Sequence, residues 1–307
     1  MMNINLINKL IKKTRHWHKK TAFSCFQNAT LRLEQKKKEI LFATIDSLNV
    51  SLEQSVKADR TPSHIIWICW FQGVESAPDL VKRCIESAQR HAPGARVVVL
   101  TDDNIPHYLD LPEHIKKKYA TGHISKAQYS DIVRTSLLYQ YGGVWMDATV
   151  FIAKTIPDSY YDNEFSSLRF ENNDHALSQG YWTAYFLASR KGCALIKLVR
   201  DILYSYWLHH DTLIEYFLID YSFLYARERY PQFERLMNEQ PITGNNRFLI
   251  RQYMNLAPDD TMMAILSRDP VGMYKLSHKE KYSLSDKGQP TLYSKILDGS
   301  FLLPDQK

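Results

Sequence analysis

Residues 129–151 read "YSDIVRTSLLYQYGGVWMDATVF". Apolar residues at helical spacing predict a helix over 126–141, and Gly142 and Gly143 end it, because glycine readily adopts the backbone conformation found just after a helix. The apolar run 144–151 that follows predicts a buried strand. A helix that leads through a glycine turn into a buried strand is typical of an α/β protein.

One acidic residue, Asp147, interrupts this strand, and Thr149 follows two positions later. Side chains of a strand alternate between its faces, so Asp147 and Thr149 are predicted to point the same way. A carboxylate and a hydroxyl that converge on one spot can hold a hard divalent cation. The strand is therefore a candidate for a functional site.

The preceding helix carries Asp131 and Arg134, which are three residues apart and therefore share one helical face. An isolated pair at this spacing is usually a surface ion pair that contributes little. Its position directly before the glycine pair and the acidic strand favours a role in the same site. Both interpretations remain open from the sequence.

The segment before this stretch alternates between strand and helix patterns. Two short apolar runs, 64–71 ("HIIWICWF") and 96–100 ("RVVVL"), predict buried strands, and the spacing of apolar residues between them predicts a helix over 79–91. A strand, a helix and a second strand in so short a segment form a βαβ unit, which implies parallel strands. Ligands of such sheets bind at the carboxyl ends of the strands.

The rest of the chain divides into two expected parts. Further helices are predicted over 112–120, 193–209 and 211–229, and further strands within 164–170 and 181–189. A separate helical stretch over about 28–57 precedes Pro62, which disfavours continuation of a helix. We therefore expect a helical extension over residues 1–60 and an α/β domain over residues 61–307.

The composition is that of a globular protein. Of the 307 residues, 45% are hydrophobic and 12% aromatic, which is enough for a full core. The four cysteines, Cys25, Cys69, Cys84 and Cys193, form no CxxC pair. This spacing argues against a zinc site and a disulfide framework, and it favours a reducing cytoplasm.

The net charge of +6 is concentrated at the N-terminus. Residues 1–33 contain seven Lys or Arg and no Asp or Glu, whereas the other 274 residues carry 32 basic and 33 acidic side chains. The nearly neutral body argues against nucleic-acid binding. The basic segment, in which Trp17 and aliphatic residues alternate with Lys, is neither a signal peptide nor a membrane span. It suits either the surface of an anionic membrane or a solvated helix.

The stretch 129–151 resembles the signature of GT-A glycosyltransferases that carry a DXD motif. In those relatives an S-D-x-x-R helix, a glycine pair and a hydrophobic strand lead into D-x-D, and here "SDIVR", "GG" and "DAT" follow in that order. More narrowly, the stretch resembles capsular polysaccharide synthesis proteins, which are related to yeast-type mannosyltransferases and clostridial glucosylating toxins. The resemblance is close over 128–152 and looser from "HIIWICWFQG" to "LSHK". Thr149 replaces the second acid of the motif, so metal affinity is expected to be weaker.

This resemblance implies the fold and the site. The fold would be GT-A, a Rossmann-like, mixed and mostly parallel sheet flanked by helices. Asp147, Thr149 and His278, the last within "YKLSHKEKY" (274–282), would hold Mn²⁺ or Mg²⁺. Asp131 and Arg134 would hold the sugar and the phosphate side of the donor. The other residues expected around the donor are Trp67, Trp70, Phe71, Gln72, Gly73, Gly142, Gly143 and Lys279. Trp67 and Trp70 fit a core position equally well, and a lone histidine is often structural.

Asp220 stands in the otherwise apolar segment "YFLIDYSFLYA", residues 216–226. An acid on a buried face must be paired or functional. With Asp131 and Arg134 it is a candidate catalytic residue, beside the acceptor or the anomeric carbon of the donor. The alternative is an ion pair with Arg227 or Arg229.

The resemblance implies a metal-assisted, retaining glycosyltransferase. It would move a hexose from a UDP-sugar to a capsular or cell-surface polysaccharide or its lipid-linked precursor. Such an enzyme would be cytoplasmic and peripheral on the inner face of the bacterial plasma membrane. The alternative is a non-catalytic nucleotide- or glycan-binding scaffold, since the second acid of the motif is missing.

Overall fold

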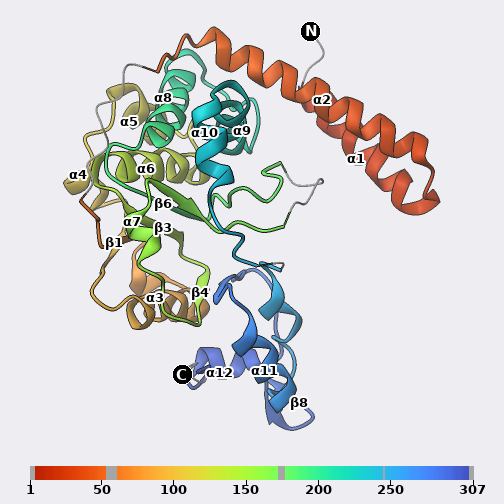
Figure 1. Cartoon of the computed structure of the whole chain (residues 1–307), viewed down its shortest axis with the longest axis vertical. Helices are drawn as coiled ribbons and strands as arrows, with labels where there is room; N and C mark the ends of the chain where they lie inside the picture. The colour runs from red at the N-terminus through yellow and green to blue at the C-terminus, as the bar shows by residue number, and fades with distance from the viewer. Residues whose placement is uncertain (1–3, 53–60, 172–176, 245, 304–307) are drawn as a thin grey trace.

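The computed structural model describes residues 4–52, 61–171, 177–244 and 246–303. Its centre is a five-stranded sheet in the order β2-β1-β3-β6-β5 (Figure 1). β1 pairs in parallel with β2 and β3, whereas β6 runs antiparallel to both β3 and β5. The strands are β1 Ile65–Cys69, β2 Arg96–Leu100, β3 Gly143–Asp147, β5 Phe165–Ser167 and β6 Phe186–Ser189.

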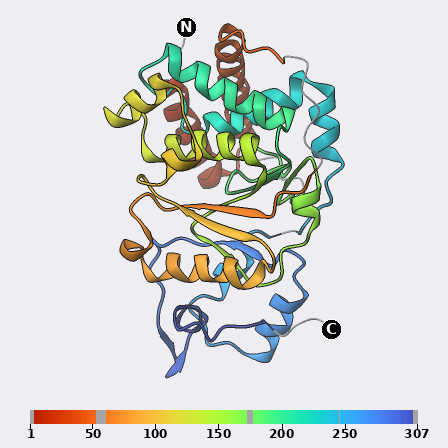
Figure 2. The same ribbon diagram turned by 90° about the vertical axis from the view of Figure 1, so that its left-hand side faces the viewer.

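Helices cover both faces of this sheet (Figure 2). α3 (Asp79–His91) lies on one face, and α6 (Lys126–Tyr141) and α8 (Ala194–His209) lie on the other. The strand residues divide accordingly, because Ile66 and Ile68 belong to one hydrophobic cluster and Trp67 to the other. The predicted class, an α/β fold with a mixed sheet flanked by helices and preceded by helices, is confirmed.

Shorter helices complete the two layers around the sheet. They are the 3₁₀ turn η1 (Val74–Ser76), α4 (Ile105–Tyr108), α5 (Glu113–Ala120), α7 (Ser159–Asp162), α9 (Leu218–Arg229) and α10 (Pro231–Asn238). α9 begins seven residues later than the helix predicted over 211–229. The segment 211–217 is instead a loop, in which Tyr206 Oη donates a hydrogen bond to the Thr212 carbonyl and accepts one from the Ile214 backbone N–H.

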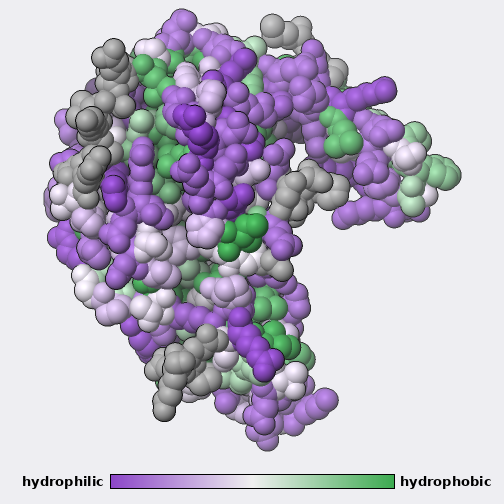
Figure 3. Space-filling view, in the orientation of Figure 1, coloured by the Kyte–Doolittle hydropathy of each residue, from purple (hydrophilic) through white to green (hydrophobic). Residues whose placement is uncertain are grey.

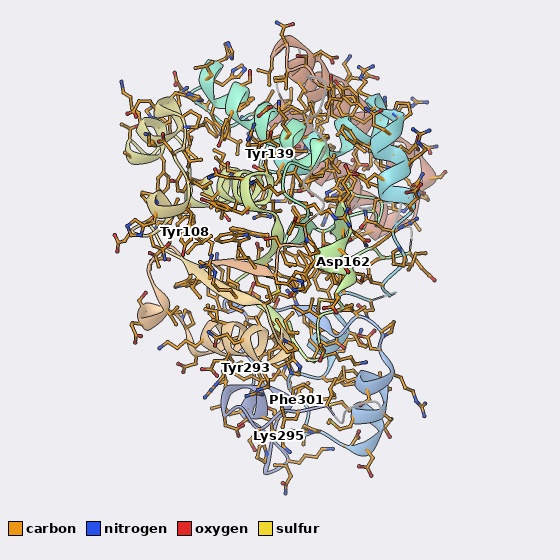
Figure 4. The ribbon with its side chains drawn as sticks, turned by 60° about the vertical axis from the view of Figure 1, so that its left-hand side comes forward. Tyr108, Tyr139, Asp162, Tyr293, Lys295 and Phe301 are labelled. Carbon is orange, nitrogen blue, oxygen red and sulfur yellow. The ribbon has the colours of Figure 1, made fainter. Side chains whose placement is uncertain are left out.

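The C-terminal segment forms a separate layer below α3. It contains the helices η2 (Leu249–Gln252), α11 (Asp260–Arg268) and α12 (Leu292–Leu297), the strand β7 (Met273–Lys275) and a hairpin of β8 (Ser285–Asp286) and β9 (Gln289–Pro290). β7 pairs with β4 (Val150–Ile152), which follows β3 in the chain, in a second small sheet. Its own hydrophobic cluster joins α3 to Phe151 and Phe301. Figure 4 shows Tyr293 and Phe301 in this layer, next to α3.

The continuous strand predicted over 144–151 is wrong. β3 ends at Asp147, Ala148 and Thr149 form a turn, and β4 begins at Val150. The strand breaks because its two halves pair with different strands. β3 pairs with β1 and β6, whereas β4 leaves that sheet and pairs with β7. The alternation argument that joined Asp147 to Thr149 therefore does not apply beyond Asp147.

The N-terminal helices form a hairpin that projects from the body (Figure 1). α1 spans Ile4–Thr21 and α2 spans Ser24–Ser47, so the second helix begins and ends earlier than predicted, and the end of the predicted range lies outside the described residues. The apolar side of α1, made of Ile4, Ile7 and Ile11, is buried. The second half of α2 packs on α9 and shares the core of the body through Leu41, Phe42 and Ile45.

Candidate active site

A cavity of about 470 Å³ opens at the carboxyl ends of β1 and β3. Such edges are where α/β sheets bind ligands, because loops diverge there and leave a crevice. Its lining comes from the ends of both strands, from α6, from the loop before β6, from the start of α9 and from the segment after β7. The lining includes Trp70, Asp131, Arg134, Asp147, Thr149, Trp182, Tyr185, Tyr216, Phe217, Asp220, Arg247, Lys275 and His278.

Arg134 is the buried centre of this site. Its Nη2 lies 3.2 Å from Asp131 Oδ1 and 3.5 Å from Asp147 Oδ1, and its Nη1 donates to the Ala184 carbonyl. The guanidinium also stacks over Trp145, with 5.1 Å to the ring centroid. Only 7% of the Arg134 side chain is exposed, so Asp131 and Arg134 are not the surface ion pair that their spacing alone allowed.

Asp147 is the best-neutralised acid of the cavity. Its Oδ2 accepts a hydrogen bond from Lys275 Nζ at 2.6 Å, and its Oδ1 accepts one from Trp145 Nε1 at 3.1 Å. Burial by itself raises the pKa of Asp147, but the positive charges of Lys275 and Arg134 outweigh burial and lower the pKa to about 2. Asp147 is therefore ionised at neutral pH.

Asp131 behaves in the opposite way. Its side chain is 15% exposed, and burial raises its pKa to about 7 even though Arg134 acts to lower it. The negative charges of Asp220 and Asp147 raise the pKa of Asp131 further. Asp131 therefore changes its charge near neutral pH, which is unusual for a carboxyl group and common in functional sites.

Asp220 lies at the start of α9, with its side chain on the cavity. It accepts a hydrogen bond from Trp182 Nε1 at 2.8 Å. Burial raises the pKa of Asp220, while this hydrogen bond and the charge of Arg134 act against burial. The alternative ion pairs are wrong, because Arg227 pairs with Glu234 and Arg229 pairs with Asp46.

The residues predicted at the end of the first strand separate into two groups. Trp70 lines the cavity, and its ring meets that of His278 edge to face, with 5.4 Å between ring centroids. Trp67 is fully buried in the core, where its Nε1 donates to the Gly142 carbonyl at 3.0 Å. Phe71 packs against the Tyr119 and Tyr129 rings. Phe71, Gln72 and Gly73 are not lining residues of the cavity.

The glycine pair serves the backbone, not the cavity. Gly142 and Gly143 have φ angles of +71° and +93°, and neither lines the cavity. A Cβ on Gly143 would lie 2.4 Å from the Ile65 carbonyl oxygen, because β3 starts directly beside β1. A Cβ on Gly142 would lie 2.7 Å from the Lys191 backbone nitrogen. The pair lets α6 turn into β3 and so fixes Arg134 opposite Asp147.

Lys279, the lysine of "YKLSHKEKY" expected near the donor, is not the lysine that meets Asp147. Lys279 is exposed and is not a lining residue, whereas Lys275 at the end of β7 reaches Asp147. The pairing of Val150 with Lys275 brings this lysine next to the turn that follows Asp147. The sequence analysis also missed Arg247, Trp182, Tyr185, Tyr216 and Phe217, which reach the cavity only through tertiary packing.

The side chains expected to hold a divalent cation do not fit one. Both Asp147 oxygens are engaged, one by Lys275, and Thr149 brings no charge. His278 is exposed, and its pKa is lowered by burial and by the charges of Lys279 and Lys275, which also repel a cation. Within the residues that the structure describes, no group of three or more His, Cys, Asp or Glu could bind a metal ion. Hard cations prefer several anionic oxygens, and this donor set offers one neutralised carboxylate.

Comparison with known proteins finds two relatives that match a little under half of the chain. O-glycosyltransferase braB of Annulohypoxylon truncatum is 26% identical over 161 residues, which cover 46% of this chain and 37% of the relative. Glycosyltransferase afumC of Aspergillus fumigatus is 24% identical over 156 residues, covering 46% of this chain and 40% of the relative. The matched part is thus well under half of the length of each of these relatives.

The solved structure of the PaToxG glycosyltransferase aligns with a TM-score of 0.41 and 14% identity, over 66% of this chain and 83% of that one. The family model described as "Capsular polysaccharide synthesis protein" matches residues 12–296, nearly the whole chain. The protein therefore belongs to the capsular polysaccharide synthesis protein family.

Proposed function

We propose that this protein is a glycosyltransferase that moves a hexose from a nucleotide sugar to a capsular or cell-surface glycan. The donor that we propose first is a UDP-sugar. The observation that carries the proposal is the cavity at the ends of β1 and β3, where Asp131, Arg134 and Asp147 meet Lys275. Family membership supports it, and so do two relatives that bear the name glycosyltransferase.

The donor lies across the carboxyl ends of the strands in this proposal. Asp131 and Arg134 hold the hydroxyl groups of the hexose, since a carboxylate and a guanidinium supply an acceptor and several donors. The nucleotide base stacks near Trp70, a contact that contributes about 1–3 kcal/mol in other proteins. Two buried donors of the site, Trp70 Nε1 and Arg134 Nε, have no hydrogen-bond partner within the described residues, and a polar ligand would supply one.

The reaction breaks the bond between the anomeric carbon and the diphosphate oxygen, and the electron pair stays on that oxygen. The acceptor hydroxyl oxygen forms the new bond to the anomeric carbon on the same face, and its proton passes to the departing phosphate oxygen. The configuration is retained, as the family resemblance implies. The positive side chains of the cavity stabilise the charge that develops on the leaving group, which is the largest expected catalytic effect.

The acceptor binds beside the donor, at the mouth of the cavity. Tyr216 and Phe217 line it and are 61% and 52% exposed, with their rings edge to face at 5.0 Å. Exposed aromatic rings suit the apolar faces of sugar rings. The loop that carries these two rings is held to α2, because Glu215 forms a buried ion pair with Lys37 of α2 at 2.6 Å. Asp220, three residues after Phe217, is then the acid next to the acceptor.

The test is release of free sugar or UDP from a panel of UDP-, GDP- and CDP-sugars, measured by chromatography. We expect one donor class to be hydrolysed slowly without an acceptor, and Arg134→Ala to lower the rate by about 100-fold or more. If no nucleotide sugar is consumed but one binds, the protein is a non-catalytic nucleotide-binding scaffold. If none binds, the proposal is wrong.

We further propose that the enzyme works on an anionic membrane, in bacteria the inner face of the plasma membrane, where a lipid-linked acceptor is available. Within the described residues, no helix is long and apolar enough to span a bilayer. The apolar side of α1 is buried, which leaves the free end of the hairpin for contact with a membrane. There Trp17 and Phe23 are 42% and 62% exposed, and Lys19 and Lys20 lie between them in the chain. Figure 3 shows hydrophobic surface at this end, surrounded by hydrophilic surface.

A further inference from the structure

We propose that Lys275, together with Arg247, binds the diphosphate of the nucleotide sugar in place of a divalent cation, and that Asp147 holds Lys275 in position. This inference rests on the proposed glycosyltransferase function. It differs from the metal-assisted reaction that the DXD-like motif implies, and it assigns Asp147 a positioning role.

The position of Lys275 is fixed from two sides. β7 pairs with β4 so that Lys275 lies opposite Val150, and the next residue, Leu276, donates its backbone N–H to the Thr149 carbonyl at 2.8 Å. The turn after Asp147 is thereby tied to the segment that carries the lysine. Lys275 Nζ then meets Asp147 Oδ2 at 2.6 Å, with 23% of the lysine side chain exposed on the cavity.

Lys275 retains donor capacity for a ligand. An ammonium group has three N–H donors, and within the described part of the chain that of Lys275 donates a hydrogen bond to Asp147 Oδ2 alone. Its charge also lies 5.6 Å from the Tyr185 ring centroid, on the cavity wall. The remaining N–H groups can therefore bind phosphate oxygens without breaking the contact with Asp147.

Arg247 supplies a second positive charge to the same cavity. Within the described residues it forms no ion pair, and its guanidinium lies 5.0 Å from the Phe248 ring centroid. A guanidinium is a strong ligand for phosphate, which it can bind through two parallel hydrogen bonds. Lys275 and Arg247 are two cations on the cavity. Together with the carboxylate of Asp147 they leave one net positive charge beside the doubly negative diphosphate diester.

The threonine at position 149 is consistent with diphosphate binding by Lys275 without a divalent cation. The second acid of a DXD motif adds negative charge that favours a divalent cation, and here an uncharged threonine stands in its position. The one acid that remains, Asp147, is already neutralised by a cation of the protein itself. The loss of the acid and the presence of Lys275 each make the site more positive by one charge, which favours an anionic diphosphate over a divalent cation.

The experiment is calorimetric titration of UDP into the full-length protein, first in EDTA and then in Mn²⁺. We expect UDP to bind in EDTA, and the dissociation constant to change by less than about threefold when Mn²⁺ is added. Lys275→Met should weaken UDP binding by about tenfold or more, the loss expected for one charged hydrogen bond. Lys275→Arg should restore most of it.

Two controls separate this role from a structural one. Lys281→Met removes an exposed lysine six residues later and should leave UDP binding unchanged. Titration with uridine, which has no phosphate, should give the same dissociation constant for the wild type and Lys275→Met, and a difference there would mean that the variant has lost its fold. UDP binding that requires Mn²⁺ would overturn the inference and leave the proposed function standing. A failure of all nucleotides to bind, with or without Mn²⁺, would overturn both.

Discussion

The buried carboxyl group of Asp131 should make the protein less stable as pH rises, and Asp131→Asn should remove this effect. Its pKa is raised to about 7 in the folded chain, from an ordinary value of 3.8. Between these values the folded protein keeps a proton that the unfolded chain has lost. Proton binding to the folded state alone means that the free energy of unfolding falls as pH increases.

The magnitude follows from the two pKa values. Between pH 5 and pH 7 Asp131 is ionised in the unfolded chain and largely protonated in the folded one. Each pH unit well below the folded pKa costs about 1.4 kcal/mol, and the cost per unit falls near pH 7, where the folded carboxyl group is already half ionised. Between pH 5 and pH 7 the carboxyl group therefore lowers the free energy of unfolding by about 2 kcal/mol. Asparagine has nearly the same shape as a protonated aspartate and does not ionise. Relative to the wild type, Asp131→Asn should therefore gain about 2 kcal/mol between pH 5 and pH 7.

The assay is urea unfolding of both proteins at pH 5, 6 and 7, followed by circular dichroism. Taking the difference between the two proteins removes the contribution of all other ionisable groups. Asp103→Asn, at an exposed position in the loop after β2, is the control and should leave the pH profile unchanged. A stability difference between Asp131→Asn and the wild type that is constant with pH would refute the reasoning. The variant should also lose donor turnover, because Asp131 is proposed to bind the sugar of the donor. Its buried carboxyl group would then serve function at a cost in stability.

Four further predictions concern other parts of the site and the hairpin. Asp147→Asn should lose most turnover and, because the pKa of Asp147 is lowered to about 2, should cost about 2 kcal/mol of unfolding free energy at pH 7; a wild-type rate would remove Asp147 from the mechanism. Gly143→Ala should cost about 1–3 kcal/mol more than Gly94→Ala in urea unfolding, because both have positive φ but a Cβ on Gly94 meets nothing within 4 Å; equal costs would contradict the close approach to Ile65. Tyr216→Ala should leave donor hydrolysis unchanged and impair transfer to a glycan acceptor, and a parallel loss of both rates would argue against an acceptor role. Trp17→Ala with Phe23→Ser should abolish sedimentation with anionic vesicles at low salt without changing UDP binding, whereas unchanged sedimentation would make the hairpin end a protein-binding surface instead.

Local sequence patterns predicted most of the elements that build the site. The helices 79–91 and 126–141 and the strand 96–100 have the predicted bounds. Their hydrophobic periodicity and their glycine ends are local signals, which the packing of the fold reinforces. The same signals led to the family, because the motif that carries the resemblance lies within one helix, one turn and one strand.

The errors arose where a residue's environment depends on distant partners. The strand predicted over 144–151 breaks at Thr149, since β4 pairs with a strand more than a hundred residues later. Trp67 lies within β1 and is buried, whereas Trp70 follows the end of β1 at Cys69 and lines the cavity. Both faces of β1 meet a hydrophobic cluster, so the alternation of side chains does not tell the two tryptophans apart. Lys275 and Lys279 both lie in one polar segment, and the register of β7 against β4 decides which of them reaches Asp147.

The most direct test of the account is a crystal structure of the protein soaked with UDP. We predict that the diphosphate lies in the cavity at the carboxyl ends of β1 and β3, within hydrogen-bond distance of Lys275 Nζ, with the base next to Trp70 and with Asp131 and Arg134 left open for the sugar. UDP bound outside this cavity, or with its diphosphate turned away from Lys275, would contradict it.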